Sequence, residues 1–258
     1  MDKKKIADSF SQASEHYDSM AYFQRNVGDD LLALVPSYQQ GSILDLGSGT
    51  GHFSEKLLSR YPRHSLVSMD LAHGMNCYAK RSVPDNRGQV WVTADAEEMP
   101  FQANSFDLVY SNLALQWCQQ IDVLANQVRH VLVPDGMLWY STLLPGTLSE
   151  LRTCWKAVDH YQHVNRFIAK ENILGAWEAA DLAVVDIVER EYQLYFEHPM
   201  QLMRELKGIG AHFVDSGSNL SLTGPGRIKK LISEYQQFRD DKGRYLATYH
   251  VMMLGVKK

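Results

Sequence analysis

Short apolar runs separated by helix-like segments dominate the hydrophobic pattern of this chain from residue 43 onward. Each run has the length of a β-strand, and helical spacing or turn residues follow it. This alternation is typical of a parallel sheet covered by helices on both faces. The predicted strands span residues 43–46, 65–69, 89–93, 106–110, 137–143, 184–195 and 247–256, and the predicted helices include 52–60, 73–81 and 120–131.

Two stretches lie outside this alternation. Residues 1–40 are expected to be helical, and residues 197–240 insert two helical segments between the last two strands. We expect both stretches to lie over the carboxyl ends of the strands as a helical lid. The tripeptide Pro134-Asp135-Gly136 is a turn signal that leads into the fifth strand.

Composition and charge exclude several classes of protein. The 258 residues are 45% hydrophobic and 22% charged, which is ordinary for one globular domain. The net charge of −4 gives no basic field for nucleic acid, and no run of apolar residues is long enough to span a membrane. The three cysteines are far apart and form no CxxC pair, and no secretory signal precedes them. We therefore expect a cytoplasmic protein with reduced thiols and with no nucleic-acid or membrane partner.

The stretch ILDLGSGTGHFSEKLL, residues 43–58, joins the first strand to a helix through a glycine-rich loop. Gly47, Gly49 and Gly51 let the backbone turn tightly and approach a ligand, because a Cβ atom there would occupy ligand space. The G-x-G-x-G spacing differs from the G-x-G-x-x-G of dinucleotide sites, which disfavours a nicotinamide enzyme. Asp45 at the strand end would repel a pyrophosphate and would suit a sulfonium ligand that carries an amino group.

Two more carboxylates follow the next two strands. Asp70 ends the second strand, in the place from which a carboxylate accepts both ribose hydroxyls. Asp95 follows the third strand, where an acceptor beside an apolar wall can bind an adenine amino group. Since ligands of open parallel sheets bind at the carboxyl ends of the strands, the three acidic residues together indicate an adenosyl ligand without phosphates.

Residues 40–145 resemble class I S-adenosylmethionine-dependent methyltransferases, through LDLGSGTG, the acidic ribose residue, DAEEMPF and FDLVYSNLALQW. The resemblance implies a Rossmann-like α/β fold with a seven-stranded, mainly parallel sheet. It also implies one domain over residues 1–258, made of a helical lid at 1–40, a cofactor-binding core at 41–145 and the remaining sheet at 146–258. The implied cofactor-binding residues are Asp45, Gly47, Ser48, Gly49, Gly51, Asp70, Leu71, Asp95, Ala96 and Asn112.

Segments spread over nearly the whole chain resemble the malonyl-acyl carrier protein O-methyltransferases of biotin synthesis. The similar segments are IADSFSQASEHYDSMAYFQRNVGDDLL, SNLALQWC, PGTLSELRTCW, LMRELKGIGAH and LATYHVMMLGVKK. The resemblance implies methylation of the free carboxyl of a malonyl thioester, with S-adenosylhomocysteine as the second product. The thioester would be carried by the phosphopantetheine of acyl carrier protein, or by coenzyme A. The methyl ester would then enter fatty-acid elongation towards pimeloyl methyl ester.

Candidate catalytic residues are Tyr17, Asn112 and Gln116. Tyr17, on the N-terminal helix, is expected to cap the cofactor pocket, and it would also bind substrate. Asn112 and Gln116 follow the fourth strand and can donate amide hydrogen bonds to a carboxylate without neutralising it. Trp117 is expected either to wall the substrate pocket or to fill the core.

Basic residues give the insert a different charge from the rest of the chain. Between residues 204 and 239 six Lys or Arg stand against three Asp or Glu, a net charge of +3, which leaves −7 for the remainder. Arg204 and Lys207 share one helix face and are candidates for pairing with the malonyl carboxylate or with an acidic carrier protein; the alternative is a solvated surface face. Lys229 and Lys230 extend the same predicted docking surface.

Other polar residues are given structural interpretations. His160 and His163 share a helical face, but Asp159 is expected to point elsewhere, so no metal site is predicted. Glu97 and Glu98 are expected to be solvated. Two other functions stay open at this point: methylation of a small carboxylic acid, phenol or amine, and a noncatalytic module that only binds S-adenosylmethionine.

Overall fold

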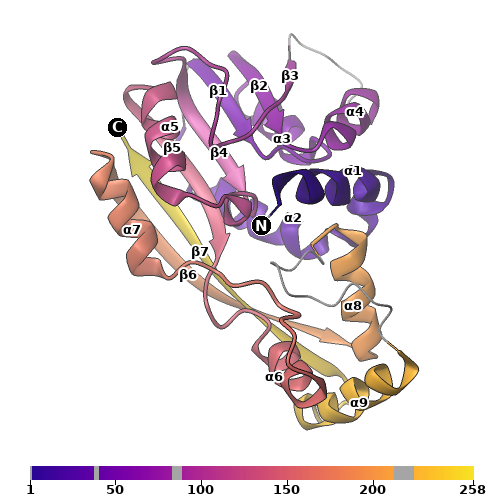
Figure 1. Cartoon of the computed structure of the whole chain (residues 1–258). Helices are drawn as coiled ribbons and strands as arrows, with labels where there is room; N and C mark the ends of the chain where they lie inside the picture. Colours follow the sequence, from indigo (N-terminus) through magenta and orange to yellow (C-terminus); the bar gives the residue numbers. More distant parts are fainter. Residues whose placement is uncertain (1, 38–40, 83–88, 212–223) are drawn as a thin grey trace.

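The computed structural model describes residues 2–37, 41–82, 89–211 and 224–258, and these form a seven-stranded sheet with helices on both faces (Figure 1). The strand order is β3-β2-β1-β4-β5-β7-β6, and only β7 runs antiparallel to its neighbours in this part of the chain. The predicted mainly parallel sheet is therefore confirmed. The strands are β1 (Gly41–Leu46), β2 (His64–Asp70), β3 (Val90–Thr93), β4 (Phe106–Asn112), β5 (Leu132–Leu143), β6 (Ala183–Phe196) and β7 (Tyr245–Lys257).

The helices follow the predicted positions where they alternate with the parallel strands. The ranges 52–60, 73–81 and 120–131 correspond to α3, α4 and α5 to within one residue at each end. Helices α6 and α7, between β5 and β6, are not among the predicted elements. The helices are α1 (Lys3–Met20), α2 (Tyr22–Leu34), α3 (His52–Arg60), α4 (His73–Ser82), α5 (Ile121–Val131), α6 (Ser149–Val158), α7 (Lys170–Ala179), α8 (Pro199–Gly208) and α9 (Pro225–Tyr235), with 3-10 turns η1 (Leu115–Trp117) and η2 (Gln236–Phe238).

Two apolar layers hold the sheet between its helices. Leu31 of α2 and Leu57 of α3 belong to the core on one face, whereas Leu124 of α5 and Trp177 of α7 belong to the core on the other. All four side chains are fully buried. This burial fixes the carboxyl ends of β1, β2 and β4 side by side at one edge of the sheet, where the predicted site residues meet.

The Pro134-Asp135-Gly136 signal does not mark the start of β5. The strand already begins at Leu132, which pairs with Phe106, and the next paired residue is Met137, opposite Leu108. The intervening residues form a bulge in which Asp135 has a left-handed φ of 64°. The turn chemistry is thus used inside the strand, to form a bulge and not a loop between elements.

The two lid segments differ in position. Helix α1 packs against α4 and against α8, and it covers the carboxyl ends of the strands (Figure 1). Helix α9 instead packs on α6, at the end of the molecule away from β1, β2 and β3 (Figure 1). Of the two described insert helices, α8 packs against the N-terminal lid whereas α9 packs on α6, which corrects the expectation that both lie over the site. No helix in the described ranges has the length and apolarity to cross a bilayer.

Candidate active site

Two pockets, here called the main chamber and the side chamber, lie at the carboxyl ends of β1, β2 and β4, beneath α1, and share four lining residues. The main chamber has a volume of about 780 Å³ including its open mouth. The side chamber adjoins the same glycine loop, since Gly47 and Gly49 line both chambers. Residues that line the main chamber include Lys3, Phe10, Asp70, Leu71, Asp95, Ala96, Leu113 and Trp117. Residues that line the side chamber include Asp18, Gln24, Arg25, Asp45, Ser48 and His52. Both chambers are lined by Tyr17, Gly47, Gly49 and Asn112.

The three glycines of the loop have different environments. A Cβ atom on Gly49 would meet nothing within 4 Å, so the space beside it is open to a ligand. A Cβ atom on Gly47 would lie 2.2 Å from the Cβ of Ala114, so this glycine is required by protein packing and not by ligand space. Gly51 has a left-handed φ of 86° and precedes α3 as its N-cap, outside the lining of both chambers. The close approach to a ligand that was expected of all three is therefore available at Gly49.

Asp70 lies at the end of β2 and faces the glycine loop. Its Oδ2 accepts a hydrogen bond of 2.8 Å from the N–H of Gly49, and its Oδ1 accepts one of 2.7 Å from the N–H of Ala72. Burial raises the pKa of this carboxyl, and the two donated hydrogen bonds act in the opposite direction. Because each carboxylate oxygen has further lone pairs, Asp70 can still accept hydroxyl groups from a ligand in the main chamber.

Asp45 is buried at the end of β1, and only 2% of it is exposed. The hydroxyl of Ser54 donates to its Oδ2 over 2.5 Å, and Ser54 in turn lies 2.9 Å from the hydroxyl of Ser68. Burial raises the pKa of Asp45 to about 7, which the hydrogen bond from Ser54 opposes and the charge of Asp70 reinforces. A cationic ligand in the side chamber would favour the ionised form of Asp45.

Asp95 is already engaged by protein groups. Its Oδ1 accepts a hydrogen bond of 2.9 Å from the N–H of Glu97, and its Oδ2 lies 2.5 Å from the ammonium nitrogen of Lys3. Lys3 also pairs with Glu97. The predicted acceptor for an adenine amino group is thus in the main chamber, but it shares its carboxylate with the first turn of α1.

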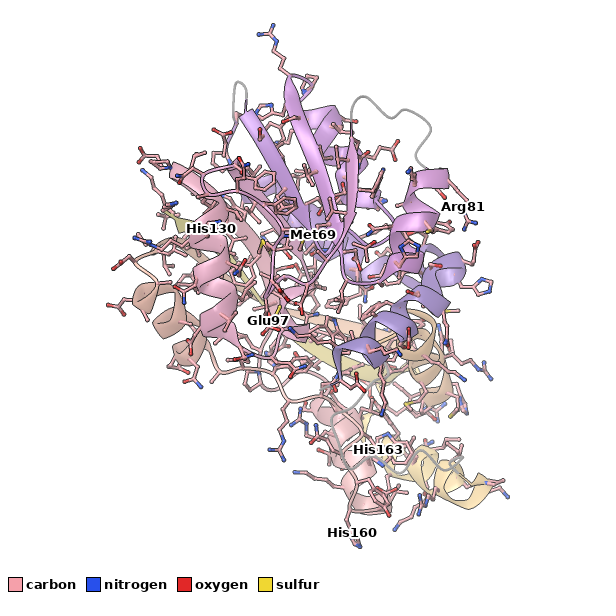
Figure 2. The ribbon with its side chains drawn as sticks, turned by 45° about the horizontal axis from the view of Figure 1, so that its top comes forward. Met69, Arg81, Glu97, His130, His160 and His163 are labelled. Atoms are coloured by element: carbon pink, nitrogen blue, oxygen red, sulfur yellow. The ribbon has the colours of Figure 1, made fainter. Side chains whose placement is uncertain are left out.

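The expectation that Glu97 and Glu98 are solvated is wrong for Glu97. Its side chain is buried, and its Oε1 accepts hydrogen bonds from the N–H groups of Gln119 and Gln120, next to the N-terminus of α5. Glu98 is exposed. Glu97 therefore ties the loop after β3 to the start of α5, where a negative charge is favourable. Figure 2 shows Glu97 and Met69 within the body of the molecule.

Tyr17 and Asn112 lie where the two chambers meet. Burial raises the pKa of the Tyr17 phenol far above its ordinary value, and the charges of Asp70 and Asp18 act in the same direction, so the hydroxyl keeps its proton. The Asn112 amide donates to the carbonyl of Gln24 over 2.8 Å, and its Oδ1 accepts from Ser141 over 2.7 Å. Asn112 therefore joins β4 to α2 and β5, and its position at the junction is fixed.

The other predicted substrate residues are placed differently. Trp117 lines the main chamber and packs edge-on against Phe10 of α1, with ring centroids 5.4 Å apart. Gln116 does not line either chamber, because its amide donates to the carbonyl of Leu113 over 2.6 Å. Arg204 and Lys207 are exposed on α8 and also lie outside both linings. The structure therefore brings Trp117 to the pocket and leaves Gln116, Arg204 and Lys207 outside it.

His163 is part of a local polar cluster beside α6. Its ring stacks on Trp155 with centroids 3.7 Å apart, and its Nε2 lies 2.8 Å from Oδ1 of Asp159. The expectation that Asp159 points away from these histidines is therefore wrong. Figure 2 places His160 and His163 at the end of the molecule where α6 lies, away from Met69 and Glu97. Among the residues with described positions, no group of three His, Cys, Asp or Glu side chains is arranged to hold a metal ion.

Several pocket residues had no signal in the sequence. Lys3, Phe10 and Arg25 reach the pocket because α1 and α2 fold over the strand ends, which a helical pattern alone does not reveal. Leu113 has a left-handed φ of 48°, an uncommon conformation for a residue with a branched side chain. This backbone turn places Ala114 against Gly47. A strained residue immediately after a strand is the kind of feature that gathers at ligand sites.

Comparisons with known proteins place this pocket in a family. Residues 44–140 match the family model of a methyltransferase domain. A malonyl-[acyl-carrier protein] O-methyltransferase of Hahella chejuensis is 38% identical over 251 residues, which are 97% of this chain and 89% of that protein. A biotin biosynthesis bifunctional protein of Cellvibrio japonicus is 38% identical over 98% of this chain, but the chain spans only 50% of its length.

Solved structures support the same fold. A methyltransferase structure from Bacillus halodurans superposes with a TM-score of 0.64 at 18% identity, and it covers 89% of this chain and 97% of its own. Identity at this level indicates the fold alone, whereas the relatives above match over nearly the whole chain, including the lid and the insert. The chain belongs to the family of malonyl-[acyl-carrier protein] O-methyltransferases.

Proposed function

We propose that this protein transfers the methyl group of S-adenosylmethionine to the free carboxyl of a malonyl thioester carried by acyl carrier protein. The products are the malonyl methyl ester and S-adenosylhomocysteine. The observation that carries the proposal is the junction of the two chambers, where Tyr17, Gly49 and Asn112 face both. Family membership supports the choice of acceptor, because the related protein of Hahella chejuensis is named for malonyl-acyl carrier protein.

The lining of the pocket fits this cofactor. In the main chamber Asp70 would accept the ribose hydroxyls, while Asp95, Leu71 and Ala96 would surround the adenine. In the side chamber Asp45 would stabilise the positive charge of the methionine part, and Ser48 lies beside the loop backbone. The open space at Gly49 allows a ligand to pass close to the loop between the chambers. When bound, the cofactor supplies an electrophilic methyl group on a sulfonium.

The acceptor needs positioning more than activation. A carboxyl group with an ordinary pKa near 4 is ionised at pH 7, so it attacks without a general base. Tyr17 keeps its proton and can donate it as a hydrogen bond to one carboxylate oxygen, which orients the other oxygen. Asn112 is held by Gln24 and Ser141 and forms a fixed wall at the junction. We assign these roles to Tyr17 and Asn112 and not to Gln116, which lines neither chamber.

The product explains the proposed place in biotin synthesis. A methyl ester resembles an ordinary apolar acyl end, whereas a free carboxylate resists burial in the hydrophobic sites of fatty-acid elongation. Methylation would therefore let the elongation enzymes extend the chain towards pimeloyl methyl ester. We propose the cytoplasm as the compartment, since Cys77, Cys118 and Cys154 are free thiols.

The exposed basic residues of the insert are the proposed contact for the acidic carrier protein. Arg204 and Lys207 lie on α8, and the segment that follows α8 touches α1: Ser9 donates to the carbonyl of Gly210 over 3.1 Å. Lys229 and Lys230 lie exposed on α9. Opposite charges on the two partners would raise the rate of association and orient the carrier protein.

Labelled S-adenosylmethionine tests the proposal directly. The protein is incubated with malonyl-carrier protein, malonyl-coenzyme A, and a panel of small carboxylic acids, phenols and amines. Base-labile label on malonyl-carrier protein, at a rate far above that on the panel, is the expected result. Transfer to a panel compound alone would replace the acceptor, and binding of S-adenosylhomocysteine without transfer to any of them would indicate a noncatalytic module.

A further inference from the structure

Arg25 contributes to the side chamber a positive charge that has no ion-pair partner among the described residues. It lies on α2, is partly buried and lines the chamber beside the glycine loop. Among the described residues, no Asp or Glu forms an ion pair with its guanidinium, and no hydrogen bond to it is found. A partly buried guanidinium without a counter-ion is costly unless a ligand supplies the negative charge.

The acids of the same chamber are already engaged elsewhere. Asp18 accepts a hydrogen bond of 2.8 Å from the hydroxyl of Thr50. Asp45 accepts one of 2.5 Å from Ser54 on the side of the protein core. The chamber thus holds acidic side chains bound to hydroxyl groups, and an arginine whose five N–H donors are available to an incoming ligand.

Three further polar atoms of the chamber lack hydrogen-bond partners. They are Oε1 of Gln24, Oγ of Ser48 and Nε2 of His52, and all three atoms are buried. The Ser48 side chain is also more than nine-tenths buried, since the residue is only 8% exposed. Buried polar groups are nearly always hydrogen-bonded. Three unpartnered buried atoms in a chamber that is also lined by an unpaired arginine therefore indicate a polar ligand at this place.

His52 adds a donor that carries no charge of its own at neutral pH. Burial lowers its pKa, and the positive charges of Lys56 and Arg25 lower it further. The hydroxyl of Ser48 can donate as well, and the planar guanidinium matches the two oxygens of a carboxylate. This set of donors is suited to a carboxylate.

We propose that Arg25 is the carboxylate-binding residue of the pocket, with Ser48 and His52 as additional donors. The inference rests on the proposed function, which offers two carboxylates: that of the malonyl acceptor and that of the methionine part of the cofactor. Both groups are carboxylates. The side chamber could hold either one, because it shares Tyr17 and Asn112 with the main chamber. Arg25 replaces Arg204 and Lys207 as the cation inside the site, because those two side chains lie outside both chambers.

The test compares a nucleoside that carries the amino-acid part, and with it the carboxylate, with a nucleoside that lacks this part. Binding of S-adenosylhomocysteine and of 5′-methylthioadenosine is measured by calorimetry for the wild type, Arg25→Gln and Arg25→Lys, together with the apparent KM for malonyl-carrier protein. Loss of a charge-assisted pair should weaken binding by about 10- to 100-fold. Arg25→Lys keeps the positive charge but not the pair of parallel N–H donors, so its affinity should fall less than that of Arg25→Gln.

The results distinguish the two sources of carboxylate. Weaker binding of S-adenosylhomocysteine with unchanged 5′-methylthioadenosine assigns Arg25 to the cofactor carboxylate. Unchanged binding of both nucleosides with a raised KM for the malonyl thioester assigns it to the acceptor. The inference is overturned if the Arg25 substitutions weaken the binding of the carboxylate-bearing ligands no more than they weaken the binding of 5′-methylthioadenosine.

A matched control removes a neighbouring charge without touching the chamber. The charge of Lys56 also lowers the pKa of His52, but Lys56 pairs with Asp29 and does not line either chamber. Lys56→Gln should therefore leave both nucleoside affinities and the KM for malonyl-carrier protein unchanged. If Arg25→Gln fails to fold, Arg25→Lys carries the same comparison. Failure of the proposed function is distinguishable, because the wild type would then either bind neither nucleoside or transfer no methyl group to malonyl-carrier protein.

Discussion

The ammonium group of Lys3 lies 2.5 Å from Oδ2 of Asp95, and it joins the first turn of α1 to the loop after β3. Both residues line the main chamber, so this ion pair connects the lid helix α1 to the loop after β3 at the proposed adenine end of the pocket. About three-tenths of the Lys3 side chain is exposed. An ion pair with such access to water contributes on the order of 1 kcal/mol or less.

Substituting Lys3 by Met should therefore loosen the lid without unfolding it. We expect S-adenosylhomocysteine to dissociate about two- to fivefold faster, because α1 loses its contacts with Asp95 and Glu97. Stopped-flow displacement measures this rate. Lys4 is exposed on the same helix and does not line the pocket, so Lys4→Met is the matched control. An unchanged rate in Lys3→Met would show that the pair does not hold the lid.

The raised pKa of Asp45 predicts a pH-dependent stability. Its pKa of about 7 in the folded protein lies above the ordinary value near 4, so the folded state holds an extra proton between these two values. Stability should fall as pH rises through this window and then level off above pH 7. The loss is on the order of 4 kcal/mol, because each pH unit between the two pKa values corresponds to about 1.4 kcal/mol. Urea unfolding at several pH values from 4.5 to 8 measures it.

The Asp45→Asn variant separates this carboxyl from all others. It should lose most of the pH dependence and be more stable than the wild type at pH 8, since no buried charge forms there. The raised pKa of Asp70 acts in the same direction and remains in the variant, so a smaller slope is expected to persist. Equal slopes in both proteins would contradict the assignment to Asp45.

The alternation of strands and helices could be predicted from the sequence because it depends on local periodicity. The helix 52–60 and the strand ends at Asp45 and Asp70 follow from apolar spacing and from glycine, and each lies where it was expected. The placement of Asp95 and Trp117 near the same pocket follows from the parallel topology. These residues share one edge of the sheet once the strand order is known.

Residues whose role depends on contacts distant in sequence could not be predicted in the same way. Glu97 looks like a loop residue, and only the approach of Lys3 and of the Gln119 and Gln120 amides explains its burial. Arg25 resembles any polar residue on an amphipathic helix until α2 is placed beside the glycine loop. Pro134-Asp135-Gly136 has the chemistry of a turn, but strand pairing on both sides converts it into a bulge.

Gly47 and Gly49 offer a paired test of packing against ligand space. In Gly47→Ala the new Cβ would lie 2.2 Å from the Cβ of Ala114 at a φ of 76°, so we expect a destabilisation of about 2 to 4 kcal/mol. In Gly49→Ala the Cβ meets no protein atom within 4 Å, and only the φ of 53° opposes it, at a cost of about 1 kcal/mol. Thermal unfolding measures both.

Ligand binding should reverse the order of the two glycine variants. Gly49→Ala should weaken the binding of S-adenosylhomocysteine by about tenfold or more, because the alanine side chain enters the space that the ligand needs. Gly47→Ala should keep its affinity at temperatures where it remains folded. Tight binding by Gly49→Ala would indicate that the ligand does not pass close to this residue.

The basic residues of α8 and α9 differ in their distance from the pocket, and this difference predicts unequal effects on the carrier protein. The loop after α8 contacts Phe10, a lining residue of the main chamber, whereas α9 packs on α6 at the other end of the molecule. Charge reversal at Arg204 and Lys207 should raise the apparent KM for malonyl-carrier protein more than reversal at Lys229 and Lys230 does. Neither pair should change the KM for malonyl-coenzyme A to the same extent, because coenzyme A presents no acidic protein surface.

Steady-state kinetics with both thioesters, at low and at physiological salt, measure these KM values. Added salt should reduce the differences, since it weakens contacts between exposed charges. Equal changes with the two thioesters would place the carrier protein on another face of the enzyme.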